Sequence, residues 1–153
     1  MADFVERKKV KTWNQHLLEM MKTIKADEND ELSEKVIGAF FEVSNELGCG
    51  FLEKVYERAL VAELQLRGLR VDTQVGFEVR YKGVWIGKYV ADLIVAGELV
   101  VELKCVERLG AEHTAQCFNY LRASGKEACL LVNFQHSRVE WKRIWRSGGG
   151  ILG

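Results

Sequence analysis

The chain has 153 residues, of which 48% are hydrophobic and 29% are charged, and it contains no proline. This length and composition are typical of one soluble globular domain that buries its own core without disulfide or metal staples. Its 22 basic residues balance its 22 acidic residues, which excludes a protein that coats nucleic acid by net charge alone, but not an enzyme with a local basic patch.

Membrane and secretory segments are not expected from this sequence. No apolar run reaches the length of a membrane span, and residues 1–13 lack the apolar stretch of a secretory signal. The four cysteines, Cys49, Cys105, Cys117 and Cys129, are widely spaced and form no CxxC pair. We therefore expect a cytoplasmic protein with reduced thiols and no membrane partner. An iron–sulfur site is disfavoured, because its ligands would have to come from a loop, a strand end, a helix and another strand.

The first half of the chain indicates an arm followed by two helices. Residues 1–30 are polar and only weakly periodic, and we predict an arm that is helical in part. Apolar residues then recur at helical spacing over 32–47 and again over 52–67, and the glycine-containing segment 48–50 separates the two runs. Two core-facing helices are therefore expected before any strand.

The second half of the chain is expected to form a sheet that is interrupted by one helix. The predicted order is ααβββαββ, or the same order with a helical last element, and residues 147–153 are expected to be a flexible tail. A helix between the third and fourth strands implies a crossover, hence an α/β (α+β) fold with a mixed sheet and helices against both of its faces. The predicted elements are strands at 75–81, 84–95 and 99–105, a helix at 112–123, a strand at 128–133 and a last element at 139–145.

Three charged residues stand in the apolar second and third strands. Asp92 and Glu102 are equidistant from Gly97, so a turn at 96–98 would place them opposite each other across an antiparallel pair. Side chains alternate faces with a period of two, so Lys104 shares the face of Glu102. We therefore expect all three side chains on one face. We also expect one of the two closely spaced acids to be hard to ionise in the metal-free protein.

A salt-bridged pair of strands on a solvated face is the simpler interpretation of these charges. It fits poorly, because apolar neighbours such as Ile94 and Val100 share the face of the charges, while Tyr89, Leu93 and Val101 are expected on the other. Carboxylates at the ends of adjacent strands are ligands that Mg²⁺ or Mn²⁺ prefers. A lysine beside them can serve an attacking water or a charged transition state. The pattern therefore indicates phosphodiester hydrolysis.

An acid on one strand followed by Glu-x-Lys on the next resembles the signature of the PD-(D/E)XK nuclease superfamily. Asp92 matches the first acid, Glu102 the second and Lys104 the lysine, whereas Ala91 stands where the name of the motif has proline. The resemblance implies a restriction-endonuclease-like core and catalytic roles for Asp92, Glu102 and Lys104. The first two would also bind the metal.

The segment from Gly50 to Tyr56 resembles the motif of the GxxExxY proteins, a branch of that superfamily, and this resemblance covers about residues 31–145. It implies a nuclease-like domain at 31–146, a metal-binding role for Glu53 and a substrate-binding role for Tyr56. Without the resemblance, Glu53 would be read as a surface glutamate at the edge of a core-facing helix.

Gln116 and Tyr120 lie four residues apart and so share one helix face. The pair resembles the QxxxY element of RecB-like nucleases, which implies substrate binding: Gln116 can bind a phosphate or a metal-bound water, and Tyr120 can stack on a base or sugar. Packing is the alternative interpretation of this pair. His113, on the same helix, is expected to be an exposed histidine near the helix start.

The sequence and the resemblance together predict a hydrolase, a nuclease that uses Mg²⁺ or Mn²⁺ and binds nucleic acid, with DNA as the expected substrate. Two alternatives stay open. One is a non-catalytic module on the same fold that binds nucleic acid or another partner, and the other is a phosphodiesterase of small molecules. A small nuclease that makes two cuts often works as a homodimer, and the arm over residues 1–30 is where such a contact is expected.

Overall fold

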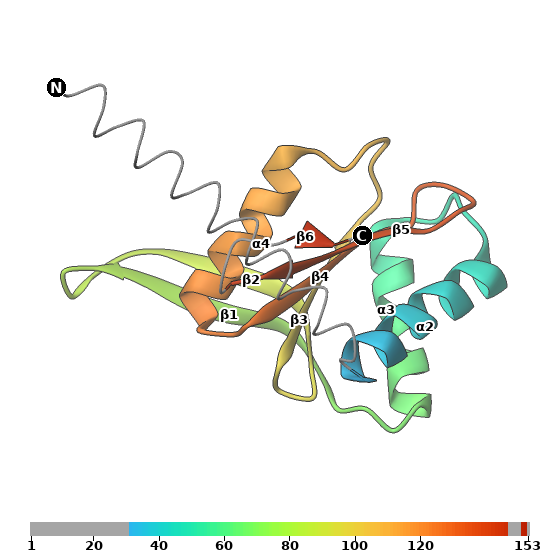
Figure 1. The fold of residues 1–153 in the computed structure, drawn as a ribbon, viewed down its shortest axis with the longest axis horizontal. Helices are drawn as coiled ribbons and strands as arrows, with labels where there is room; N and C mark the ends of the chain where they lie inside the picture. Colours follow the sequence, from blue (N-terminus) through green and yellow to red (C-terminus); the bar gives the residue numbers. More distant parts are fainter. Residues whose placement is uncertain (1–30, 147–150, 153) are drawn as a thin grey trace, which may run out of the picture.

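A computed structural model describes residues 31–146 and 151–152 (Figure 1). The predicted arm over residues 1–30 lies outside the described residues. The described helices are α2 (Glu31–Leu47), α3 (Glu53–Leu66) and α4 (Ala111–Ser124). The described strands are β1 (Val71–Tyr81), β2 (Val84–Val95), β3 (Leu99–Lys104), β4 (Ala128–Asn133), β5 (Glu140–Trp145) and β6 (Ile151–Leu152).

The strands of the described residues form one mixed sheet in the order β1-β2-β3-β4-β5-β6. Neighbouring strands are antiparallel except β3 and β4, which are parallel. Since parallel neighbours need a crossover, the chain leaves the sheet after β3, forms α4 and returns as β4. The predicted mixed sheet is therefore confirmed, and β3 lies in its interior.

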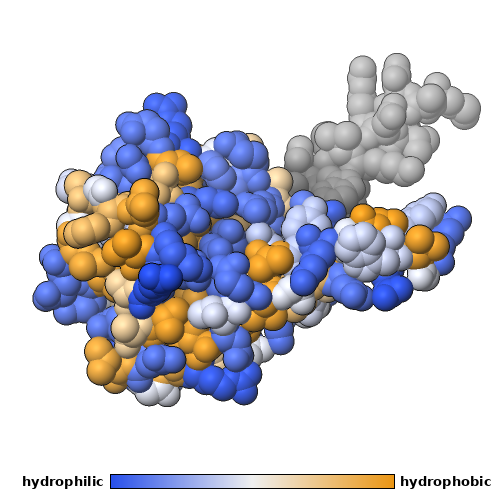
Figure 2. All heavy atoms as spheres, turned by 180° about the vertical axis from the view of Figure 1, so that it is seen from behind, coloured by the Kyte–Doolittle hydropathy of each residue, from blue (hydrophilic) through white to orange (hydrophobic). Residues whose placement is uncertain are grey.

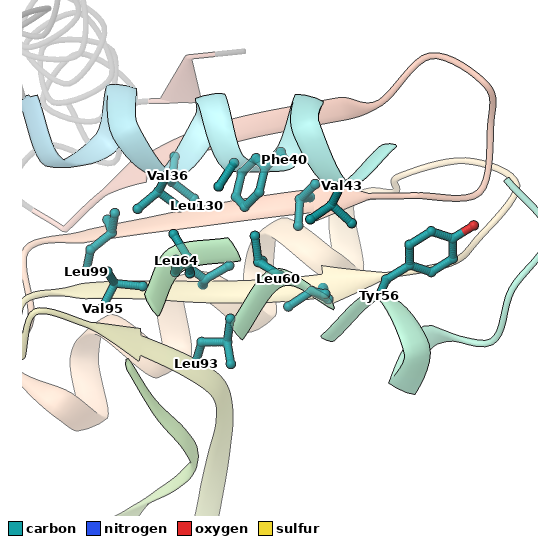
Figure 3. Close-up of a cluster of buried hydrophobic side chains, with 14 of the residues drawn as sticks. Val36, Phe40, Val43, Tyr56, Leu60, Leu64, Leu93, Val95, Leu99 and Leu130 are labelled. Carbon is teal, nitrogen blue, oxygen red and sulfur yellow. The ribbon is translucent and has the colours of Figure 1, made fainter. Parts of the chain in front are cut away.

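Helices cover the sheet on both faces, as expected. Helices α2 and α3 lie together on one face, and α4 lies on the other (Figure 1). The side chains between α2, α3 and the sheet form the larger apolar cluster, in which Phe40, Leu60 and Leu93 are fully buried (Figure 3). Burial of each such side chain contributes about 1.5–3 kcal/mol to stability. A second cluster joins α4 to the opposite face and includes Cys117 and Leu131.

Two tight hairpin turns fix the register of the first three strands. The central residues of both turns have positive φ, 49° and 83° at Lys82 and Gly83, and 53° and 70° at Ala96 and Gly97. Paired positive φ values are those of the type I′ turn, whose twist matches that of the strands it joins. In β2 and β3 the resulting register pairs Leu93 with Val101.

One detail differs from the sequence predictions: strand β1 begins at Val71, four residues before the predicted start, because its pairing with β2 extends to Val95. The last predicted element is the strand β5, as in the first of the two predicted orders. Residues Ile151–Leu152, within the predicted tail, form the short strand β6 against β5. The open edge of β5 offers backbone groups that such a segment can pair with.

The hairpin of β1 and β2 extends beyond α4 (Figure 1). We call it the β1–β2 arm, and it is distinct from the predicted arm over residues 1–30. The register places Gln74 of β1 opposite Asp92 of β2, and Gln74 has a left-handed φ of 51° that interrupts the ladder. Ala91, the next residue of β2 toward the tip of the hairpin, lies on the opposite face of the sheet from Leu93, two residues away on the same strand. Tyr89 packs with the α4 cluster, and not on the face of Leu93 as strict alternation predicted.

Apolar side chains stay exposed at the tip of the arm. Val84 and Ile86 retain 63% and 58% of their surface there, and apolar and polar residues are mixed over this region (Figure 2). The tip therefore receives no support from the two clusters, and its hairpin depends on backbone pairing and on its turn.

The four cysteines are free and do not gather at one place. Cys117 and Cys129 are buried in the α4 cluster, Cys105 packs against the other cluster, and Cys49 is exposed. An iron–sulfur site that uses all four is therefore incompatible with the fold.

Tyr56 ties the loop between α2 and α3 to the core. Its hydroxyl donates to the Gly48 carbonyl at 2.7 Å and accepts from the Phe51 amide at 3.3 Å. Its ring is fully buried and stacks on Phe134 with centroids 4.9 Å apart. The predicted substrate-binding role of Tyr56 is thereby corrected, because neither the ring nor the hydroxyl is free to meet a ligand.

Removal of the Tyr56 hydroxyl should destabilise the fold without disturbing the aromatic stack. Tyr56→Phe deletes two hydrogen bonds of the loop, and we expect the free energy of unfolding to fall by about 1–2 kcal/mol. Urea denaturation followed by circular dichroism measures this change. Tyr81→Phe is the matched control, since Tyr81 is 60% exposed at the arm tip. Equal stability of the two variants would contradict the role assigned to Tyr56.

Candidate active site at the end of the central strand

The register between β2 and β3 brings Asp92 and Glu102 together. The regular pairing of the two strands ends at Leu93 and Val101, and one more step along each strand gives Asp92 and Glu102. At this point the Asp92 side chain replaces the backbone carbonyl as hydrogen-bond acceptor: its Oδ2 accepts from the Leu103 amide at 2.8 Å. The Asp92 carboxylate is thus fixed at the place where the two strands separate.

Glu102 is a buried acid in the middle of the sheet, with only 3% of its surface exposed. Its Oε1 lies 3.6 Å from the Lys104 ammonium, two residues further along the same strand. Its Oε2 is buried and has no hydrogen-bond partner in the described residues. A buried oxygen without a partner is costly, so this atom is a natural position for a ligand that binds oxygen.

The surroundings of Glu102 favour its neutral form. Burial and, after it, the neighbouring charge of Asp92 are the main causes that raise its pKa from the ordinary value of 4.5 to about 9. The Lys104 ammonium lowers the pKa but does not offset burial. The expectation that one of the two acids is hard to ionise is confirmed, and Glu102 is that acid.

Helix α3 brings a third carboxyl group to the same place. Glu53 is the first residue of α3, and burial raises its pKa, followed by the charge of Asp92. The Lys104 ammonium and the backbone amide of Cys105 lower that pKa. Glu53 is therefore within electrostatic reach of Asp92, Lys104 and the end of β3.

Two further residues of the site were missed by the sequence analysis. Gln74 of β1 donates from Nε2 to Glu57 Oε1 at 3.2 Å and lies 3.5 Å from Asp92 Oδ1. Glu57 is 6% exposed and also accepts from Lys54 at 3.0 Å. The helical spacing of Glu57, four residues after Glu53, is a signal that could have identified it. Gln74 lay outside the predicted strand, so nothing in the pattern pointed to it.

Helix α4 contributes the pair that was expected to bind substrate. Gln116 donates from Nε2 to the Tyr120 hydroxyl at 3.0 Å. Burial raises the pKa of Tyr120, and the charges of Glu102 and Asp92 raise it further, so the hydroxyl lies near both acids. The Tyr120 ring is 3% exposed and meets Tyr89 edge to face, with centroids 5.6 Å apart. Stacking of Tyr120 on a base, as the sequence suggested, is therefore excluded by its burial, and Gln116 is the more accessible member of the pair.

Two other predicted residues stay outside this cluster. The Nδ1 atom of His113 accepts from the Gly110 amide at 2.9 Å, so this half-buried histidine supports the start of α4. Tyr56 lies in the core, as described above. The structure thus brings together Asp92, Glu102, Lys104 and Glu53, with Gln116 and Tyr120 beside them.

The donor set fits a hard divalent cation. Asp92, Glu102 and Glu53 supply carboxylate oxygens, and the unpartnered Oε2 of Glu102 is one that a cation would satisfy. In the described residues no three His, Cys, Asp or Glu side chains already converge to hold a metal. Mg²⁺ does not require such a cage, because it keeps several waters and binds through one or two carboxylates together with substrate phosphate.

Comparison with known proteins shows which protein family this chain resembles. The sequence pattern of the PD-(D/E)XK nuclease superfamily matches residues 30–144. No curated protein matches. The solved structure of SSO0001 is similar, with a TM-score of 0.50 and 22% identity over 61% of this chain and 50% of that one. An alkaline exonuclease from Laribacter hongkongensis, LHK-Exo, aligns with a TM-score of 0.46 and 16% identity over 61% of this chain and 54% of that one.

The matched region therefore spans about half the length of either solved chain. Among the described helices, none is long and apolar enough to cross a membrane.

The stability of the metal-free protein should fall as pH rises from about 4.5 to about 9. In this window Glu102 is protonated in the folded chain and ionised in the unfolded chain. The unfolded chain then binds fewer protons, so the free energy of unfolding decreases with pH, by at most about 1.4 kcal/mol per pH unit from this one group.

Urea denaturation in a chelator at several pH values measures this dependence. Glu102→Gln keeps the shape of the side chain and cannot ionise, so its profile should be flatter and its stability higher near pH 8. Glu98→Gln, at the exposed turn before β3, should behave as the unmodified protein does. Identical profiles for the Glu102→Gln and unmodified proteins would refute the buried, proton-holding state.

Proposed function

This chain belongs to the PD-(D/E)XK nuclease superfamily, and from that premise we propose that it is a metal-dependent nuclease that hydrolyses phosphodiester bonds of nucleic acid, with DNA as the substrate. The observation that carries the proposal is the buried carboxyl group of Glu102, which lies beside Asp92 and has Lys104 at 3.6 Å and an oxygen without a partner. Most buried polar atoms in proteins have a hydrogen-bond partner, so the unpartnered oxygen favours a ligand site over a purely structural ion pair.

In this proposal Asp92 and Glu102 would hold one or two Mg²⁺ or Mn²⁺ ions, and Glu53 would assist them. When bound, the cation supplies Lewis-acid stabilisation of the phosphate and a more acidic water. The Asp92 carboxylate is already oriented by the Leu103 amide at 2.8 Å, and Gln74 lies 3.5 Å from its other oxygen. Such prior orientation lowers the cost of assembling the site.

Lys104 is the cation that we assign to the reacting groups. Its side chain is 18% exposed, so the ammonium can reach both Glu102 and a substrate that covers the end of β3. From this position it can orient or help deprotonate the attacking water, or stabilise the charge that develops on the phosphate oxygens.

Gln116 is the residue that we expect to contact the substrate strand. Its amide is held by the buried Tyr120 hydroxyl at 3.0 Å, which leaves the amide oxygen available for a metal-bound water. Tyr120 is then a positioning residue, and it fixes Gln116 on the side of the acids that faces α4.

Substitution of the central residues should abolish cleavage. With labelled single-stranded and double-stranded DNA and RNA in Mg²⁺ or Mn²⁺, we expect Asp92→Asn, Glu102→Gln and Lys104→Met to lower the rate roughly a hundredfold or more. An excess of chelator should abolish cleavage by the unmodified protein. Mononucleotide esters, tested alongside, identify a phosphodiesterase of small molecules if they alone are hydrolysed.

Asp72→Asn and Lys35→Met are the matched controls, because both side chains are exposed and Asp72, like Asp92, lies on a strand. They should keep full activity. Cleavage that survives Asp92→Asn or chelation would remove the proposed site, and no cleavage of any substrate would favour a non-catalytic module.

Metal binding should also be visible without catalysis. Because a cation would bind the folded site and not the unfolded chain, saturating Mn²⁺ should raise the melting temperature, and a concentration a hundredfold above the dissociation constant corresponds to about 2.7 kcal/mol. Differential scanning calorimetry measures the shift. We expect Asp92→Asn to lose most of it and Asp72→Asn to keep it. An equal shift in both variants would mean that the ion binds elsewhere.

A further inference from the structure

A pocket of about 390 Å³ lies between the β1–β2 arm and α4, outside the cluster of acids. It is open on one side, where exposed residues form its mouth, and it combines aromatic, amide, charged and aliphatic side chains. Its lining residues are Glu78, Val79, Arg80, Tyr89, Asn119, Arg122 and Ala123.

The pocket continues from the candidate active site. Tyr89, on its wall, meets Tyr120 edge to face with centroids 5.6 Å apart, and Tyr120 carries the hydrogen bond from Gln116. Asn119 follows Gln116 by three residues, which is about 4.5 Å along a helix that rises 1.5 Å per residue. The pocket therefore adjoins the candidate active site through the contact of Tyr89 with Tyr120.

The polar groups of the pocket suit a nucleobase better than an isolated phosphate. Glu78 and Arg80 neutralise each other in an ion pair of 3.0 Å, so they add little net positive charge. The amide of Asn119 can donate to and accept from the edge of a base, and the Tyr89 ring offers an aromatic surface beside it. Arg122 forms no ion pair within the described part of the chain, and its place at the mouth leaves it free to meet the phosphate of the same nucleotide.

We propose that this pocket holds one unpaired nucleotide of the strand that is cut. Bases within a duplex are stacked and paired, so their faces and edges cannot enter a pocket of this kind, whereas an unpaired base can. The substrate is therefore single-stranded nucleic acid, or a duplex with a single-stranded segment next to the cleaved bond. The link to cleavage rests on the proposed function, but binding of the unpaired nucleotide does not.

Binding in the presence of EDTA separates the two questions, since no cleavage can then occur by the proposed mechanism. Fluorescence anisotropy at one fixed salt concentration gives the affinity for a labelled single-stranded oligonucleotide, a blunt duplex and a duplex with a single-stranded end. We expect the two substrates with unpaired nucleotides to bind at least tenfold more tightly than the blunt duplex. Asn119→Ala combined with Arg122→Ala should remove most of that preference.

The control for this double variant is Asn45→Ala combined with Lys35→Ala, which changes an amide and a cation on the exposed side of α2. It should bind as the unmodified protein does. A second measurement places the fluorescent base 2-aminopurine in the single-stranded end. Its emission should be quenched on binding, and Tyr89→Leu should restore the emission.

Two results would overturn the inference. One is equal affinity for blunt duplex and single strand, and the other is a preference that the Asn119 and Arg122 substitutions leave unchanged. These outcomes are distinct from failure of the proposed function. Cleavage of blunt duplex without preference would leave the nuclease in place and remove the pocket's role, whereas selective binding without cleavage would keep the pocket's role and remove the nuclease.

Discussion

The burial of one carboxyl group, that of Glu102, is the constraint around which this structure is arranged. Strand β3 has a neighbour on each side and helices over both faces, so Glu102 on this strand is shielded from most of the bulk water. An ionised carboxylate in such a place costs several kcal/mol unless it is paired. Lys104 offsets part of this cost, Asp92 adds to it, and the outcome is a glutamic acid that keeps its proton. The unfavourable free energy of burying this carboxyl group is limited to Glu102 and its immediate neighbours. The surrounding apolar side chains contribute the folding stability that offsets it.

The place where β3 ends lets elements from opposite sides of the sheet meet. Helix α3 belongs to the layer on one face, yet its first residue, Glu53, reaches past the strand end to Asp92 and Lys104. Helix α4 covers the other face and brings Tyr120 toward the same acids. Gln74 links Glu57 of α3 to Asp92 of β2. A site at a strand end can therefore draw on both layers, whereas a site in mid-sheet would be confined to one.

The sequence predicted the parts of the site that depend on local geometry. The position of Gly97 midway between Asp92 and Glu102, together with the period of two, was enough to expect these acids on one face with Lys104. The predicted helices and strands agree with the structure to within a few residues, because their apolar spacing directly reflects which face is buried. The resemblance supplied Glu53 and Gln116, which no spacing rule connects to the hairpin.

The parts that were missed depend on packing between distant segments. Tyr56 follows Glu53 by three residues, but its ring points into the core and its hydroxyl closes a loop, a distinction that spacing does not reveal. Gln74 joins the site because its backbone is left-handed. Glycine or asparagine at this position would have indicated such a conformation in the sequence, but glutamine does not. The burial of Tyr120 depends on how closely α4 approaches Tyr89, which is a property of the assembled layers.

The bond between Asp92 and the Leu103 amide has a consequence for how such proteins diverge. Because the carboxylate replaces a backbone acceptor where β2 and β3 separate, any relative that lacks Asp92 loses this contribution to folding stability, whatever its function. Lys104 makes no comparable bond from its side chain to the backbone within the described residues, and its ammonium pairs with Glu102. Among natural variants of this fold, replacement of the lysine should therefore cost less folding stability than replacement of the aspartate.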